Sequence, residues 1–211
     1  MIDRFWTTWE YLSQGGWVMI PMAVASLVMW TMILERYGTF RRLGGRDIET
    51  VDALRALEGE PVPDRGSGQR RKVLEGFLTA RSGIDSLDRI ILRSVTEKNR
   101  RFLRKKLAFI AVLAGVAPLL GLLGTVLGMI QTFDVIAIFG TSNAKAMAGG
   151  ISVALVTTQA GLVVAIPGLF VSGFLTRRSR RLESALDEFS LALDRKLKAH
   201  GELEVMEAQS T

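Results

Sequence analysis

The stretch "APLLGLLGTVLGMIQTF", residues 117–133, contains no charged side chain and spends three positions on glycine. Glycine is the least favourable of the ordinary residues in a helix, so its use here needs a reason. Gly121, Gly124 and Gly128 recur at intervals of three and four residues, and "GTVLG" is a GxxxG pattern. Such spacing places small residues on one helix face, where a second helix can approach closely inside a membrane. The stretch predicts a membrane-spanning helix that packs tightly against another helix.

Three uncharged runs divide the chain. They are Trp17–Leu34 (18 residues), Leu107–Phe133 (27 residues) and Ala146–Thr176 (31 residues). A helix needs roughly 20 apolar residues to cross a bilayer, so the first run is just long enough and the others exceed it. The helices of a soluble bundle would show a polar stripe, and these runs have no charges to form one. We therefore expect an all-α integral membrane protein with three transmembrane helices and long cytoplasmic helical extensions.

The basic residues predict the orientation. Of the 27 Lys and Arg residues, 25 lie in the segments 36–106 and 177–211, including the clusters "RRFLRKK" (100–106) and "RRSRR" (177–181) beside the runs. Three spans put these two segments on the same side, which the positive-inside rule makes cytoplasmic. We expect a multi-pass protein of the bacterial inner membrane, with its N-terminus in the periplasm and its C-terminus in the cytoplasm.

The expected segments follow from these boundaries. The aromatic N-terminus indicates an interfacial helix rather than a cleavable signal. Helical spacing favours helices at 47–58 and 87–106, with a Gly/Pro-rich linker at 59–71, and the helix at 87–106 is expected to run unbroken into the second span. The expected organisation is a periplasmic interfacial helix (1–16), span one (17–35), a cytoplasmic loop with helices (36–106), span two (107–133), a periplasmic loop (134–145), span three (146–176) and a cytoplasmic helical tail (177–211).

Small residues and one threonine form a face on each of the two longer runs. One-sided helical spacing collects Ala114, Pro118, Gly121, Thr125, Gly128 and Thr132 in the second span, and Gly150, Ala154, Thr158, Gly161 and Ala165 in the third. One interpretation is packing between helices of one subunit. The other is that Thr125 and Thr158, matched in depth, line a polar path or receive a partner helix. Thr157 and Gln159 lie on other faces, where they can bridge neighbouring subunits.

No Asp, Glu, His, Lys or Arg lies inside any of the three runs. Proton-moving membrane proteins almost always use an ionisable group within the membrane, so in a proton channel another subunit would have to supply it. The chain has no Cys, a single His at position 200, and none of the common nucleotide-binding, hydrolase or metalloprotease motifs. We expect no enzyme activity, no cofactor and no metal site. The basic clusters beside the spans are better suited to anionic phospholipid than to nucleic acid.

Taken together, residues 117–133 and "GISVALVTTQAGLVVAIPG" (150–168) resemble the signature helices of the MotA/TolQ/ExbB proton-channel family, closest to ExbB and TolQ. The resemblance implies a pentamer around a central pore, which holds a single-span ExbD- or TolR-like partner with an essential Asp. It also implies that Thr125 and Thr158 line the pore. The small residues that spacing places on the same faces, Gly121, Gly128, Ala154, Gly161 and Ala165, would then pack on the pore face, with Thr157 and Gln159 as polar support.

One position departs from the family pattern. Many ExbB and TolQ chains have Glu where this chain has Val153, so either that acid is dispensable here or Gln159 partly replaces it. The leading hypothesis is a stator subunit that uses the proton motive force for a periplasmic or outer-membrane process such as TonB-dependent import, with a TonB- or TolA-like protein as a further partner. The alternatives are a TolQ-like subunit of a Tol-Pal-type system and a helical scaffold that conducts nothing.

Overall fold

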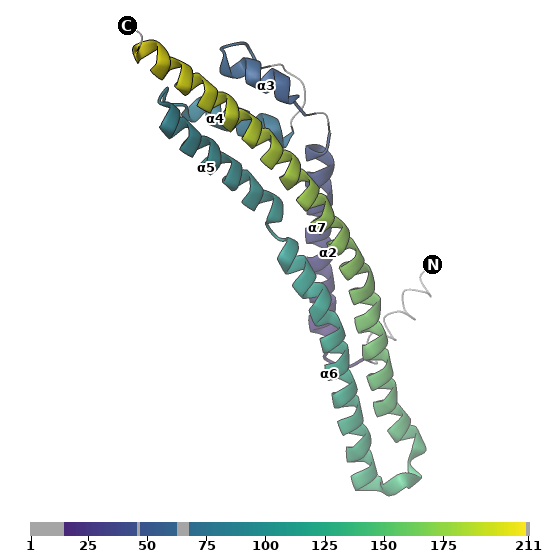
Figure 1. Cartoon of the computed structure of the whole chain (residues 1–211). Coiled ribbons are helices and arrows are strands. Elements are labelled where there is room, and N and C mark those ends of the chain that lie inside the picture. Colours follow the sequence, from purple (N-terminus) through teal and green to yellow (C-terminus); the bar gives the residue numbers. More distant parts are fainter. Residues whose placement is uncertain (1–14, 46, 63–67, 210–211) are drawn as a thin grey trace. The chain divides into compact units, whose positions relative to one another are not determined.

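The computed structural model describes residues 15–45, 47–62 and 68–209, with side chains described up to residue 199. The expected interfacial helix at 1–16 therefore lies outside the described residues, apart from Gly15 and Gly16. The described part is helical and contains no strand. Its elements are α2 (Met19–Leu43), α3 (Thr50–Leu57), α4 (Gln69–Ala80), α5 (Asp85–Arg104), α6 (Leu107–Phe139), the short 3-10 helix η1 (Gly140–Ser142) and α7 (Ala144–Gln209) (Figure 1).

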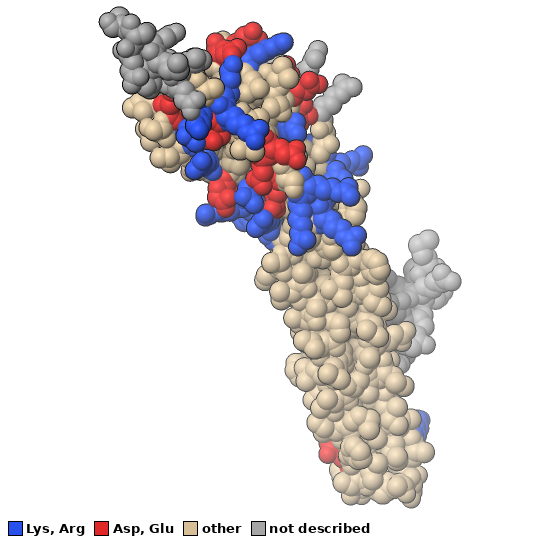
Figure 2. All heavy atoms as spheres, in the orientation of Figure 1, with Lys and Arg blue, Asp and Glu red and all other residues tan. Residues whose placement is uncertain are grey.

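The chain forms two compact units. The first comprises the residues up to Glu35 together with Lys106–Phe174, and the second comprises Arg36–Lys105 together with Leu175–Thr211. Charged side chains gather on the second unit, whereas the described residues on the visible face of the first are almost all uncharged (Figure 2). Among the described residues, three helical segments are long and apolar enough to cross a membrane. The all-α class with three membrane-spanning helices is therefore confirmed.

In the first unit, α6 and α7 form an antiparallel hairpin through the turn at Gly140–Asn143. α6 begins at Leu107, at the start of the second uncharged run, and continues to Phe139. Pro118 and Pro167 lie inside α6 and α7 without ending either helix. The buried residues of α6 recur every three or four positions and are almost all small or short, which makes a narrow contact stripe; they are Leu107, Ile110, Ala114, Ala117, Gly121, Gly124, Gly128 and Thr132.

The expected unbroken helix from residue 87 into the second span is wrong. α5 ends at Arg104, Lys105 is extended (ψ 135°), and Lys106 takes the left-handed conformation (φ 70°) before α6 begins. Lys106 is the one described residue other than glycine with a positive φ, a conformation that is unfavourable for a side chain with a Cβ. Its ammonium group binds both carboxylate oxygens of Glu35 at 2.8 and 2.5 Å, which anchors the break.

The second unit has its own hydrophobic core. α3, α4, α5 and the C-terminal part of α7 bury apolar side chains against one another, with Phe77 of α4, Leu92 of α5 and Phe189 of α7 at most 1% exposed. Helix α4 was not expected from the sequence, because its first residues lie in the expected linker. The Asp47 carboxylate accepts hydrogen bonds from the amides of Arg70 (2.9 Å) and Arg71 (3.2 Å) at the start of α4. A carboxylate there satisfies free helix amides, so a residue distant in sequence caps this helix.

Ion pairs join α5 to α7 inside the second unit. Arg104 binds the nearly buried carboxylate of Glu183 at 2.6 Å, and Arg89 binds Asp194 at 3.0 Å. Burial alone would raise the pKa of Glu183, but hydrogen bonds from Arg104 and Ser179 outweigh it and hold the pKa below its ordinary value. The hydrogen bond from Arg89 likewise lowers the pKa of Asp194. These pairs favour one alignment of the two helices.

Candidate functional site

Glycines bring the backbones of α6 and α7 into direct contact. A Cβ added at Gly121 would lie 3.0 Å from the carbonyl oxygen of Thr157 and 3.2 Å from the Cα of Thr158. At Gly128 it would lie 2.6 Å from the carbonyl oxygen of Gly150. Real Cβ atoms essentially never approach as closely as at Gly128, and the approach at Gly121 is tighter than nine in ten real Cβ contacts, so a side chain at either position requires its neighbours to shift. The contact explains why glycines occur in a spanning helix despite their low helix propensity.

Thr157 lies at the centre of this contact rather than on another face. Its side chain is fully buried, and it occupies the space that a Cβ on Gly124 would need. Its hydroxyl donates to the carbonyl oxygens of Val153 (2.8 Å) and Ala154 (3.0 Å) in its own helix. Within one chain, Thr157 therefore fills the hollow beside Gly124. Gln159, two residues further along α7, is exposed.

Thr125 and Thr158 lie at the same level of the hairpin and on the same side of it. Each follows directly after a member of the contacting pair Gly124–Thr157. One residue turns a helix by about 100°, and because the two helices run in opposite directions, both turns lead to the same side of the pair. The structure thus brings together the two threonines that the sequence analysis matched in depth.

The hydroxyls of both threonines have defined partners. Thr125 donates to the carbonyl oxygen of Leu122 at 2.6 Å, and Thr158 donates to that of Ala154 at 3.1 Å. Both side chains are half-buried. Since the donor is used within the helix, each oxygen keeps lone pairs that can accept a hydrogen bond from water or from a protonated acid.

The opposite side of the hairpin is covered by the chain before and within α2. A Cβ on Gly15 would lie 3.3 Å from the Thr157 methyl group, and one on Gly16 would lie 3.9 Å from Val153. Further along, Met29 of α2 occupies the space beside Gly168. Val153 therefore lies toward the covered side, away from Thr125 and Thr158, so a carboxylate at this position would not share their side of the hairpin.

The side that carries the two threonines is otherwise apolar and open in the single chain. Its neighbouring side chains are exposed, with Leu122 at 60%, Met129 at 40%, Leu155 at 67% and Leu162 at 47%. An apolar surface of this kind inside a membrane suits lipid or another helix, and the two hydroxyl oxygens are its polar features. The side offers hydrogen-bond acceptors but no group that can itself bind and release a proton near neutral pH.

The remaining predicted residues lie in the contact between the two helices. Ala154 and Ala165 are 6% and 1% exposed, and Gly161 faces Gly121 across the hairpin. Gly124, which forms the GxxxG pattern with Gly128, lies in the same contact. These small residues set the helix spacing, and thereby the positions of Thr125 and Thr158.

Comparisons with known proteins identify relatives of this chain. The profile of the MotA/TolQ/ExbB proton channel family matches residues 68–188, more than half of the chain. The putative biopolymer transport protein ExbB-like 1 of Synechocystis sp. is 34% identical over 172 residues, which cover 77% of this chain and 67% of that protein.

Two further relatives carry the names of two branches of the family. The biopolymer transport protein ExbB of Aquifex aeolicus is 46% identical over 85 residues, 40% of this chain and 56% of that protein. The Tol-Pal system protein TolQ of Pseudomonas aeruginosa is 28% identical over 207 residues, 85% of this chain and 87% of that protein. The matched region includes the α6–α7 hairpin with its two threonines, and the chain belongs to the MotA/TolQ/ExbB proton channel family.

Proposed function

We propose that the chain is a proton-channel stator subunit of the bacterial inner membrane that conducts protons together with an ExbD- or TolR-like single-span partner. The observation that carries the proposal is the placement of Thr125 and Thr158 at one level and on one side of a hairpin that has no ionisable group in its spans. The proton-binding group is then an aspartate on the partner helix, which lies against this side.

The two hydroxyls would act on that aspartate as hydrogen-bond acceptors. Their donors are already bound to Leu122 and Ala154, so the free lone pairs suit a protonated carboxyl group or a water that carries a proton toward it. In a site of low dielectric constant, such hydrogen bonds are electrostatically stronger than in water. The small residues Gly121, Gly128, Ala154, Gly161 and Ala165 would support the path by keeping α6 and α7 close together.

The assembly and the orientation belong to the same proposal. The exposed apolar side chains on the threonine side are available to pack against the partner and against further copies of the chain, as in the pentamer expected from the family. Gln159, exposed on α7, would then provide a polar contact to a neighbouring copy. Under the positive-inside rule, the basic residues of the second unit support a cytoplasmic position for it and a periplasmic N-terminus.

The process that is driven lies on the periplasmic side. Relatives named for biopolymer transport and for the Tol-Pal system both match the chain. TonB-dependent import is therefore the first candidate process, and a Tol-Pal-type role in the cell envelope is the second. A TonB- or TolA-like protein would receive the force.

Substitution of the threonines tests the proposal. Thr125→Leu and Thr158→Leu should each reduce proton-driven activity at least about tenfold, because the bulkier side chain removes the acceptor and blocks the partner helix. The mass of the purified complex should stay unchanged. Thr31→Leu is the control, since Thr31 in α2 is exposed and likewise donates to its own helix, at 2.7 Å to Leu27. If both path variants keep the activity of the control, the threonines do not line the path.

A further inference from the structure

A basic groove lies at the C-terminal end of α5. Its volume is about 530 Å³, and it is lined by Lys98, Arg101, Phe102, Arg104 and Lys105. The lining thus combines four cations with one aromatic ring and contains no acid. Phe102 is 43% exposed, so its ring offers the groove an apolar surface.

Two of these cations, Lys98 and Lys105, make no ion pair with the described residues. Arg104 is paired with Glu183 at 2.6 Å and Arg101 with Glu97 at 3.4 Å. No side-chain ion pair or hydrogen bond of Lys98 or Lys105 occurs within the part of the chain that the structure describes. Both lysines are exposed, so the groove offers two free ammonium groups to a ligand.

Further positive charge surrounds the same aromatic ring. The guanidinium carbon of Arg36 lies 5.3 Å from the centroid of the Phe102 ring, and the ammonium nitrogen of Lys72 lies 5.9 Å from it. Both distances are within the range of cation–π attraction. Six cations therefore lie on or beside the groove, and this excess favours an anionic ligand.

The place of the groove in the sequence identifies the source of that anion. Lys105 is two residues before Leu107, the first of 27 consecutive uncharged residues in the second candidate span. Cations at the end of a span lie at the depth of the lipid phosphates, and basic pockets at this depth bind anionic headgroups. The apolar face of Phe102 suits the glycerol and upper acyl region of the same molecule, which a soluble phosphate or a nucleic acid lacks.

We infer that this groove is a binding site for the phosphodiester headgroup of an anionic diacyl phospholipid, held mainly by Lys98 and Lys105. The two ammonium groups contact the phosphate oxygens, and Phe102 packs against the glycerol region. The site is separate from the threonine side of the hairpin, and it requires no proton conduction.

Native mass spectrometry of the purified full-length protein tests this site. The protein in detergent is mixed with equal amounts of phosphatidylglycerol and phosphatidylcholine of identical acyl chains, and the retained lipids are counted per chain. We expect selective retention of phosphatidylglycerol. The double variant Lys98→Ser/Lys105→Ser should retain at least about fivefold less phosphatidylglycerol per chain, since each cation near a membrane surface contributes measurably to anionic lipid binding.

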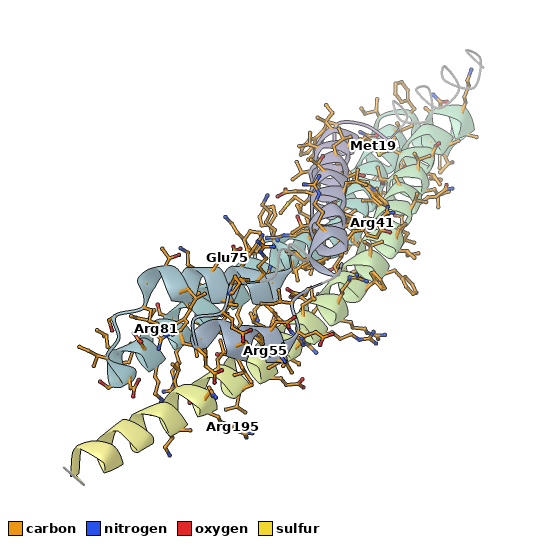
Figure 3. All side chains as sticks on the ribbon, turned by 90° about the horizontal axis from the view of Figure 1, so that it is seen from above. Met19, Arg41, Arg55, Glu75, Arg81 and Arg195 are labelled. Atoms are coloured by element: carbon orange, nitrogen blue, oxygen red, sulfur yellow. The ribbon has the colours of Figure 1, made fainter. Side chains whose placement is uncertain are left out.

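The matched control is Arg55→Ser/Arg195→Ser, which removes the same charge. Both arginines, labelled in Figure 3, are exposed on the second unit, in α3 and α7, and neither lines the groove. This control should retain the lipid as the unchanged protein does. Equal loss in both double variants would show general charge attraction and overturn the site, as would no loss in either. Displacement by 10 mM glycerol phosphate would instead assign the groove to a soluble phosphate, which also contradicts the proposal.

Discussion

At the scale of single residues, the small side chains of α6 are used for contact and the two threonines are left on one open side. The sequence predicted which residues share a face, because helical spacing follows directly from the chain. It did not predict that Thr157 fills the hollow at Gly124, since the rotation of α7 about its own axis is set by packing against α6 and α2. Adjacent threonines at 157 and 158 look equivalent in the sequence and have different surroundings in the fold.

Gly124 provides a direct test of this packing. Gly124→Ala should lower the stability of the protein by about 1–3 kcal/mol, because the new methyl group overlaps Thr157 and forces the helices apart. Gly115→Ala is the control in the same helix, since nothing lies within 4 Å of the position that its Cβ would take. The control should be neutral or slightly stabilising, as alanine favours a helix. Thermal unfolding followed by circular dichroism compares the two. Equal melting temperatures would contradict the close contact.

At the scale of elements, the structure adds two features that local patterns did not predict. Helix α4 begins within a stretch that resembles a linker, although Val73, Leu74 and Phe77 have helical spacing. The break between α5 and α6 has neither Gly nor Pro to indicate it, and at the break Lys106 pairs with Glu35, which is far away in sequence. Contacts between distant residues cannot be inferred from the local periodicity of either segment.

The cap of α4 should be measurable. Asp47→Ala should cost about 0.5–2 kcal/mol, because it leaves the first amides of α4 without their acceptor. Glu49→Ala serves as the control, since Glu49 precedes α3 without making a side-chain cap. Hydrogen–deuterium exchange of the peptide that covers residues 69–80 reports the difference. Exchange as slow as in the control would show that the cap contributes nothing.

The α5–α7 ion pairs predict a dependence of stability on pH. The pKa values of Glu183 and Asp194 are lowered in the folded protein, so the stabilisation by these pairs is fully present above the ordinary carboxyl pKa values of 4.5 and 3.8. It is lost as the pH falls below those values and through the lowered ones. Melting temperatures measured from pH 7 to pH 3 should therefore decline most steeply below about pH 4.5.

Glu183→Gln tests the origin of this decline. The variant should melt at a lower temperature at pH 7, because Arg104 loses its anionic partner, and its melting temperature should depend less on acid. An acid dependence as steep as that of the unchanged protein would mean that other groups cause it.

At the scale of the whole molecule, the proposed topology has the basic second unit in the cytoplasm and the turn between α6 and α7 in the periplasm. The chain has no cysteine, so single cysteines can report the sides. Ser142→Cys in the turn should react with a membrane-impermeant maleimide in cells whose inner membrane is intact. Ser94→Cys in α5 should react only after that membrane is opened. The reverse pattern would invert the topology. Both serines are exposed in the structure, so access to solvent does not distinguish them.

The central claim is that this chain forms a proton path that depends on an acid from a partner. The direct measurement is proton flux into sealed vesicles, followed with a pH-sensitive dye under an imposed membrane potential. Vesicles that contain the chain with its single-span partner should take up protons, while the chain alone, or the complex with the partner's intramembrane Asp changed to Asn, should show background flux. Thr158→Leu in the complex should reduce the flux to that background. Flux through the chain alone as fast as through the complex, or full flux in the Thr158→Leu complex, would contradict the account.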